Sequence, residues 1–264
     1  MLGKLMKYEW KATWKLLVPM NLFIVLMWIL SYITVQLSFF DSNSELVIMT
    51  GTMIIMAYVL SMIVVAIGTM IYLIYHFYKS VYGDEGYLLH TLPVDKHHII
   101  IAKAVMSAVW VIINSILVYV SIISLFSTQR AFMSTMLDAF ELYVNMASVN
   151  GIEIGVFELV MTFVASFFAL IARILKITAC VSLGQLAPNH KVLSSFGFYY
   201  GIYFVQRILT MFYYIVVFGF MARTGDPGWF FGSSWEFTLI SNLLYSVIFY
   251  FLTWYVMEKK LNLD

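Results

Sequence analysis

Six apolar stretches, each long enough to cross a lipid bilayer, constrain this chain more than any other feature of its sequence. A hydrocarbon core of about 30 Å needs about 20 apolar residues in a helix. Only 11% of the 264 residues are charged, whereas a water-soluble domain has about 25%. The sequence therefore predicts an all-α integral membrane protein with a single transmembrane domain over residues 1–264. The expected spans are about 19–37, 47–75, 99–126, 156–177, 193–221 and 237–257.

The distribution of lysine predicts how the chain is oriented. Cytoplasmic loops of membrane proteins are enriched in Lys and Arg. Lysines gather in the N-terminal segment, around the loop between spans two and three, between spans four and five and at the C-terminus, while the alternate loops are acidic. Both termini are therefore expected in the cytoplasm, which requires an even number of spans. The first apolar run lacks a small-residue cleavage site, so we expect it to act as its own insertion signal.

The segment before the first span, 1–17, has the pattern of an amphipathic helix lying in the membrane interface. At about 100° per residue its four lysines fall within an arc of about 80°, opposite tryptophan and leucine side chains, and Pro19 allows a sharp turn into the first span. A basic N-terminus that only directs insertion is the alternative. Glu9 falls on the apolar side, so we expect it to have a cationic partner. The residues assigned to this interfacial helix are Lys4, Lys7, Glu9, Trp10, Lys11, Trp14 and Lys15.

The sequence motifs of common catalytic sites are absent. None of the 14 glycines belongs to a phosphate-binding loop, so ATP hydrolysis is not expected in this chain. There is no His-Glu-x-x-His zinc motif and no Gly-x-Ser-x-Gly nucleophile elbow. The single cysteine, Cys180, excludes a cysteine cluster for a metal. We therefore expect no catalytic residue, no bound metal and no nucleic-acid partner.

Three histidines leave an enzymatic alternative open. His90, His97 and His98 cluster before the third span and resemble part of the ligand set of membrane di-iron desaturases. Such a site needs more histidine ligands than the five that this chain contains. Interfacial histidines without a catalytic role are therefore the simpler interpretation, and an integral membrane enzyme is the alternative.

The loop between spans two and three carries the most distinctive segment, YGDEGYLLHTLPV at 82–94. Gly83 to Gly86 indicates a turn with two carboxylates, and Gly86 to Leu92 leaves room for barely two helical turns before Pro93. A helix this short is not stable alone. We therefore expect it to dock on the membrane surface or on a cytoplasmic partner that accepts its tyrosine and leucine side chains.

This segment and two others resemble the permease subunits of bacterial type-2 ABC (ATP-binding cassette) exporters. The other two are the opening LMKYEWKATWKLLVP (5–19) and ITACVSLGQLAPNHKVLSSFGFYYGIYFV (177–205), so that about a quarter of the chain is covered. The resemblance implies an N-terminal interfacial helix, six spans and a short coupling helix in the first cytoplasmic loop. Asp84 and Glu85 would face basic groups on an ATPase, or they form a solvated turn. The residues assigned to ATPase coupling are Asp84, Glu85, Gly86, Tyr87, Leu88, Leu89, Leu92 and Pro93.

The resemblance also implies a function and partners. The chain would be the transmembrane permease of an ATP-driven exporter in the bacterial plasma membrane, moving a peptide or an amphipathic small molecule by alternating access. A second copy or a homologous permease would complete the membrane part. A separate cytoplasmic ABC ATPase with ATP and Mg would supply the energy. A non-transporting membrane protein that gives immunity by sequestering a peptide is an alternative from another class.

Two charges within the predicted spans suggest an intramembrane pair. Arg207 lies near the middle of the fifth span, where a charge costs about 2.5–3.5 kcal/mol on insertion scales. Counted at about 1.5 Å per residue, Glu158 in the fourth span comes to a similar height. We predict a Glu158–Arg207 pair, as a structural clamp or as a lining of the export path, unless 211–231 re-enters the membrane. Arg173 and Lys176 are expected to extend to the cytoplasmic interface.

Overall fold

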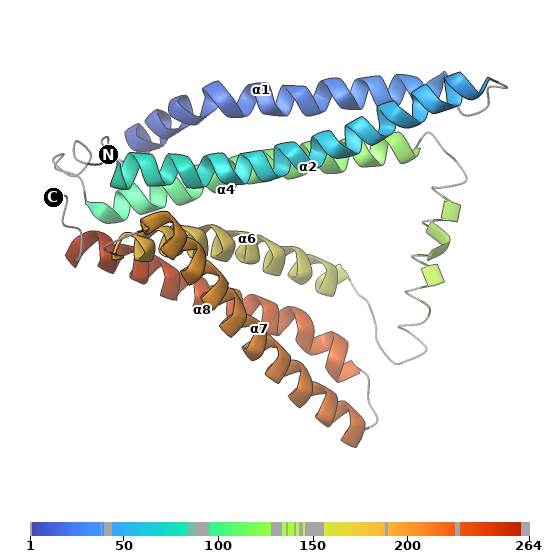
Figure 1. Cartoon of the computed structure of the whole chain (residues 1–264). Coiled ribbons are helices and arrows are strands. Elements are labelled where there is room, and N and C mark those ends of the chain that lie inside the picture. The colour runs from blue at the N-terminus through green and yellow to red at the C-terminus, as the bar shows by residue number, and fades with distance from the viewer. Residues whose placement is uncertain are drawn as a thin grey trace. The chain divides into compact units, whose positions relative to one another are not determined.

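The structure, a computed structural model, is all-helical over the residues that it describes, with no strand among them (Figure 1). The long helices are α1 (Leu2–Gln36), α2 (Glu45–Tyr82), α4 (Lys96–Ser127), α6 (Val156–Gly184), α7 (Lys191–Thr224) and α8 (Gly228–Lys259). The described residues are 2–37, 39, 44–83, 86, 95–127, 134–135, 137–139, 141–142, 145, 156–187, 190–224 and 228–259.

These six helices are all long and apolar enough to cross a membrane, which confirms the predicted all-α class and the six candidate spans. Each helix extends beyond its predicted span; α2 continues to Tyr82 and α6 to Gly184. An apolar run marks only the hydrocarbon core, whereas backbone hydrogen bonding continues past it. α7 is unbroken from Lys191 to Thr224, so a re-entrant segment beginning at residue 211 is not observed.

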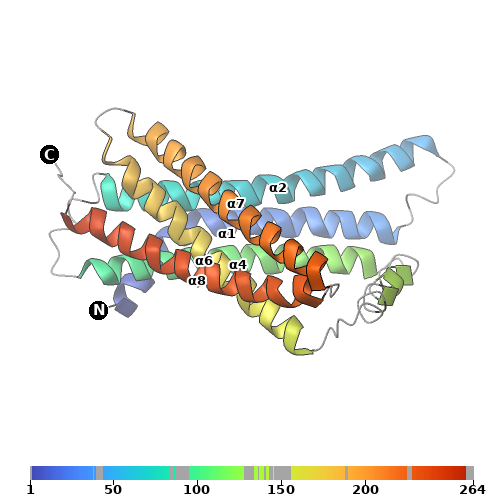
Figure 2. The same ribbon diagram turned by 90° about the horizontal axis from the view of Figure 1, so that it is seen from below.

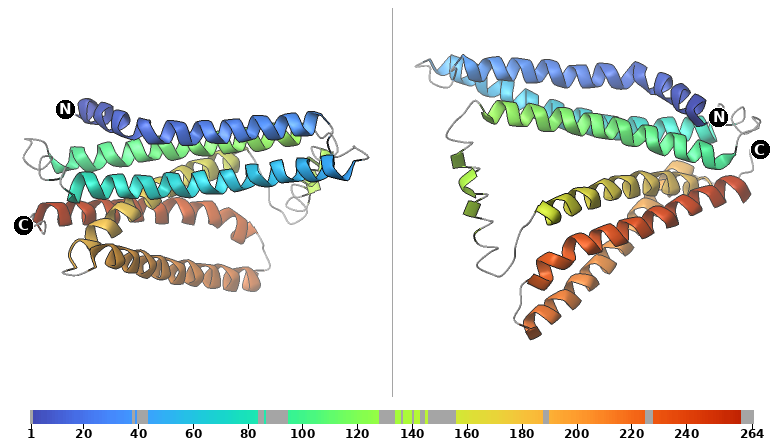
Figure 3. Two further views of the ribbon diagram at one scale, coloured as in Figure 1. Left: turned by 45° about the horizontal axis from the view of Figure 1, so that its top comes forward. Right: turned by 180° about the vertical axis from the view of Figure 1, so that it is seen from behind.

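The chain divides into two compact units, and each is described by itself. Unit 1 is Met1–His76 with Val105–Ala139. In it, α1 runs alongside α2 and α4 (Figure 3), and Leu17, Leu73 and Trp110, one from each helix, form a buried cluster. Because lipid is as apolar as leucine, such helices associate through close packing and hydrogen bonds rather than through the hydrophobic effect.

Unit 2 is Phe77–Ala104 with Phe140–Asp264, and α6 is its central helix. α6 packs against both α7 and α8, and α7 is inclined to α8 (Figure 2). Ala165, Ala172 and Ala179 recur every seventh residue on α6 and are all buried, and such small side chains let helices approach closely. In contrast, α7 buries only Val217 among its described residues.

The turn expected at Pro19 is not observed. The segment predicted as a separate interfacial helix and the first span form one continuous helix, α1, with Pro19 inside it. Packing explains the difference, because Glu9, Thr13 and Leu17 before the proline lie on the same buried face as Asn21 after it. The helix bends toward its N-terminal end (Figure 3), and Lys4, Lys7, Lys11 and Lys15 are exposed.

Gly184, at the end of α6, allows the start of α7 to approach closely. A Cβ atom at this position would meet the Ser195 hydroxyl and lie 2.8 Å from the Lys191 carbonyl oxygen. We expect Gly184→Ala to lower the free energy of unfolding by about 1 kcal/mol, the low end of the cost of overpacking. The matched control is Gly201→Ala on α7, where a Cβ meets nothing within 4 Å, and where alanine should stabilise the helix by about 0.5–1 kcal/mol. Unfolding in detergent measures both, and equal effects would contradict the close approach.

Candidate functional site

Polar side chains line the interior of unit 1. On α1 alone the buried polar residues are Glu9, Thr13, Asn21, Ser31 and Thr34. In a chain that spans a membrane, such groups are costly to bury unless they are paired, and they mark functional sites or helix contacts. The partners of these side chains therefore define the candidate site.

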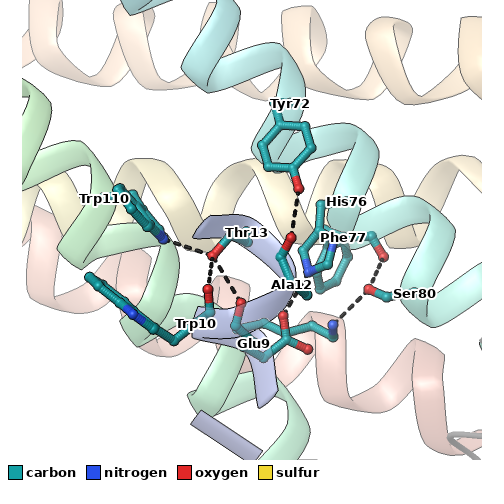
Figure 4. A network of polar contacts seen from close by, with 10 residues as sticks. Glu9, Trp10, Ala12, Thr13, Tyr72, His76, Phe77, Ser80 and Trp110 are labelled. Atoms are coloured by element: carbon teal, nitrogen blue, oxygen red, sulfur yellow. Dashed lines mark hydrogen bonds and ion pairs between the residues drawn. The ribbon is translucent and has the colours of Figure 1, made fainter. Parts of the chain in front are cut away.

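Glu9 and His76 form a side-chain contact between α1 and α2 (Figure 4). His76 Nε2 lies 2.8 Å from Glu9 Oε2, and Glu9 is 5% exposed. The ring of Tyr72 stacks on that of His76 at 5.9 Å, and the Tyr72 hydroxyl donates to the Ala12 carbonyl at 3.3 Å. The sequence predicted a cationic partner for Glu9, and His76, 67 residues away, is a partner that the sequence did not indicate.

A tryptophan pair lies beside this contact and joins α1 to α4. Trp110 Nε1 donates to Thr13 Oγ1 at 2.8 Å, and Thr13 Oγ1 donates in turn to the Glu9 carbonyl at 2.9 Å. The ring of Trp110 stacks on that of Trp10 at 4.7 Å. Trp10 was assigned to the lipid-facing side of an interfacial helix, and in the structure it packs inside unit 1.

Further hydrogen bonds continue along the same three helices. Asn114 Nδ2 lies 3.4 Å both from Asn21 Oδ1 and from Thr69 Oγ1, so it bridges α4, α1 and α2. Trp28 Nε1 donates to Ser124 Oγ at 2.6 Å, and the Tyr58 hydroxyl bonds Ser121 Oγ at 2.7 Å. Unit 1 is therefore held together by polar contacts over much of its length.

Unit 2 buries the ammonium group of Lys176 between α6 and α7. Lys176 is 7% exposed and donates to Gln206 Oε1 at 3.1 Å. Its Nζ atom also lies 4.9 Å from the ring centre of Tyr199 and 5.6 Å from that of Tyr203. The expectation that Lys176 extends to the cytoplasmic interface is therefore wrong, because α7 supplies an amide oxygen and two aromatic faces for its charge. Arg173, in contrast, is exposed.

The structure does not bring Glu158 and Arg207 together as an ion pair among the described residues. The Arg207 guanidinium lies over the ring of Tyr203 at 4.9 Å, and Glu158 lies in the first turn of α6. Because α6 continues to Gly184, Glu158 is about 39 Å along it from that end, whereas Arg207 is about 24 Å from the Lys191 end of α7. The two residues are therefore at different heights, and their pairing stays a prediction that these contacts do not support.

Of the residues assigned to ATPase coupling, Gly86 is described by the structure. The others lie outside the described residues: Asp84, Glu85, Tyr87, Leu88, Leu89, Leu92 and Pro93. Gly86 is buried, its N–H donates to the Gly83 carbonyl at 2.8 Å, and a Cβ on it would collide with the backbone of Val81. Gly86 therefore lies against the end of α2, and the predicted turn with two carboxylates stays a prediction because Asp84 and Glu85 lie outside the described residues.

The helix ends on either side of this segment are bonded to other helices of unit 2. Tyr82 donates to Ser182 Oγ on α6 at 2.6 Å, and Lys96 pairs with Glu258 on α8 at 3.3 Å. His97 Nδ1 lies 2.6 Å from the Tyr250 hydroxyl of α8, and its ring stacks on Trp254 at 5.2 Å. Lys103, 4% exposed, donates to Ser80 Oγ at 2.6 Å. α2 and α4 are thus tied to each other, to α6 and to α8 around the predicted coupling loop.

The histidines of the enzymatic alternative make contacts with different partners where the structure describes them. His97 packs on α8 as described above, and His98 Nδ1 lies 3.6 Å from the Asp95 carboxylate, while His90 lies outside the described residues. In the described part of the chain no group of three or more His, Cys, Asp or Glu side chains is arranged to hold a metal ion.

Comparisons with protein-family models, with curated proteins and with solved structures find no match for this chain.

Proposed function

We propose that this chain is the transmembrane permease subunit of an ATP-driven ABC exporter in the bacterial plasma membrane, with both termini in the cytoplasm. In this proposal a separate cytoplasmic ATPase binds ATP and Mg and presses on the loop at 84–94. A second copy or a homologous permease completes the transport path, and alternating access moves a peptide or an amphipathic small molecule. Six helices of spanning length and the three sequence segments that resemble such permeases support this proposal.

The observation that carries the proposal is the set of contacts at the two ends of the loop. Tyr82 is bonded to Ser182 on α6, and Lys96 and His97 are bonded to Glu258 and Tyr250 on α8. A force applied to the loop would therefore move α2, α4, α6 and α8 together, instead of being absorbed by a flexible connection. A solvated loop with no partner would not need such anchoring.

The proposal is tested by purifying the tagged chain from its native membrane in mild detergent and assaying ATPase activity in the eluate. We expect an ATPase to copurify and to be lost in the Tyr87→Asp/Leu88→Asp variant, because the carboxylates oppose docking of an apolar helix. The matched control is Leu46→Asp, an exposed leucine in the first turn of α2, at the other end of that helix.

The outcomes of this purification separate the alternatives. Copurification that survives the Tyr87/Leu88 change would contradict the assigned coupling segment. A chain recovered with no nucleotide-dependent partner would contradict the exporter and favour a peptide-immunity protein or a membrane enzyme. The combined replacement of His90, His97 and His98 then distinguishes these two, since only the enzyme requires all three.

A further inference from the structure

α7 carries a stripe of polar and aromatic side chains along a helix that is largely exposed. At 3.6 residues per turn the members of this α7 stripe fall within an arc of about 100°. They are Tyr199, Tyr203, Gln206, Arg207, Thr210 and Tyr214. A polar stripe on a membrane-spanning helix needs polar surroundings that lipid tails do not provide.

Within this stripe, Arg207 is the charged residue, and its guanidinium has N–H donors that can bind a ligand. Arg207 is exposed, and its guanidinium carbon lies over the ring of Tyr203, 4.9 Å from the ring centre. A guanidinium has five N–H donors, and a contact with one aromatic ring leaves donors available. The ion pairs of the described residues, between His76 and Glu9, Lys96 and Glu258, and His98 and Asp95, do not include it.

Arg207 stands at one end of an elongated groove on α7. The groove has a volume of about 550 Å³ and is lined by Arg207, Thr210, Met211, Tyr214, Ile215 and Phe218. Beyond Arg207 its surface is almost entirely apolar, and Met211 and Phe218 are 66% and 60% exposed. From Arg207 to Phe218 it extends about 16 Å along the helix. It therefore combines one cationic group with an apolar strip as long as an extended alkyl chain or a short peptide.

We propose that this groove binds the acidic, amphipathic cargo of the exporter: a carboxylate or phosphate of the cargo pairs with Arg207, and its apolar part lies along Met211 to Phe218. This inference rests on the proposed function. A guanidinium binds carboxylate and phosphate oxygens through two parallel hydrogen bonds. The stripe thereby selects against amphiphiles with a cationic head group.

The position of Arg207 favours a cargo over a resident phospholipid. Arg207 lies 16 residues after Lys191 and 17 before Thr224, about 24 and 26 Å from the two ends of α7. Phospholipid head groups lie at the membrane surfaces, whereas this cation is at the middle of the helix. An anionic group reaches it only by leaving the head-group region for the middle of the helix.

The proposal is tested on the full chain in nanodiscs of zwitterionic lipid with two photoreactive probes of the same length. One is a long-chain fatty acid that carries a diazirine on its tail, and the other is the corresponding alcohol. We expect the acid to label the peptide containing 211–218 about tenfold more than the alcohol does, as one charge-assisted contact predicts. Arg207→Gln should abolish the difference, and Arg207→Lys should retain part of it. Equal labelling by acid and alcohol in the unmodified chain would overturn the proposal, whatever the variants do.

The matched control is Arg173→Gln, which removes an exposed arginine of α6 that does not line the groove. It should leave the difference between the two probes unchanged, and loss of the difference in this variant would contradict the assignment to Arg207. Copurification of the ATPase keeps the two proposals apart. An ATPase partner without Arg207-dependent labelling overturns only the cargo site. Arg207-dependent labelling in a chain that recruits no ATPase overturns the cargo role together with the exporter.

Discussion

Trp110→Ala is expected to lower the free energy of unfolding by about 3 kcal/mol, the low end of the range for removing a large aromatic side chain from a core. Trp110 is 2% exposed and stacks on Trp10, so alanine would leave a cavity between α1 and α4. The low end is appropriate because exposing apolar surface to lipid costs little, and the loss is mainly one of packing. Thr13 keeps its hydrogen bond to the Glu9 carbonyl, so the substitution does not leave this buried hydroxyl without a hydrogen-bond partner. Denaturant unfolding of the purified chain in detergent micelles measures this loss.

Two further tryptophan variants separate packing from hydrogen bonding. Trp110→Phe keeps most of the aromatic contact and loses the bond to Thr13, so we expect a loss of about 1 kcal/mol. Trp14→Ala, on a tryptophan that is 48% exposed, serves as the matched control and should cost less than Trp110→Ala by about 2 kcal/mol or more. Equal losses at Trp14 and Trp110 would show that unit 1 does not pack as described.

The number and class of the helices could be predicted from the sequence because span length and hydropathy are properties of a single segment. The apolar run after Pro19 and the run before Gly184 each identify a helix without knowledge of its neighbours. Helix ends were less predictable, since the hydropathy that marks the hydrocarbon core carries no signal for the turns beyond it. The seven residues from 178 to 184 that extend α6 beyond its predicted end also removed the basis for placing Glu158 level with Arg207.

The partners within unit 1 could not be predicted because a helix in lipid is apolar on every side, which hides the face that packs. Nothing in the sequence connects His76 to Glu9 or Asn114 to Asn21. One signal was present, however: Glu9, Thr13 and Asn21 recur at intervals of four and eight residues and so share a helical face. That spacing indicates the buried face of α1 and argues for continuing the helix through Pro19.

Breaking the contact between Glu9 and His76 is expected to have the second largest effect on stability. His76→Leu removes a hydrogen-bond partner at 2.8 Å from a carboxylate that is 5% exposed, and the loss of a hydrogen bond to a charged group costs about 1.5–3 kcal/mol. Glu9→Leu alone leaves His76 without this acceptor. In the double variant neither polar group remains, so its loss should be smaller than the sum of the single losses by about 1.5 kcal/mol.

This non-additivity is the critical result, because any single change in a packed region can reduce stability. The matched control is His98→Leu, whose side chain is 41% exposed and which should change the free energy of unfolding by less than about 0.5 kcal/mol. Losses at Glu9 and His76 that simply add would mean that the two side chains do not interact, and α1 would then be held to α2 by its other contacts, such as the hydrogen bond from Tyr72 to Ala12. A coupling of the expected size would instead show that the segment before Pro19 is fixed to α2 by a buried polar contact. A change in the position of α2 would then move the lysine-bearing N-terminal turns of α1, even though those lysines are themselves exposed.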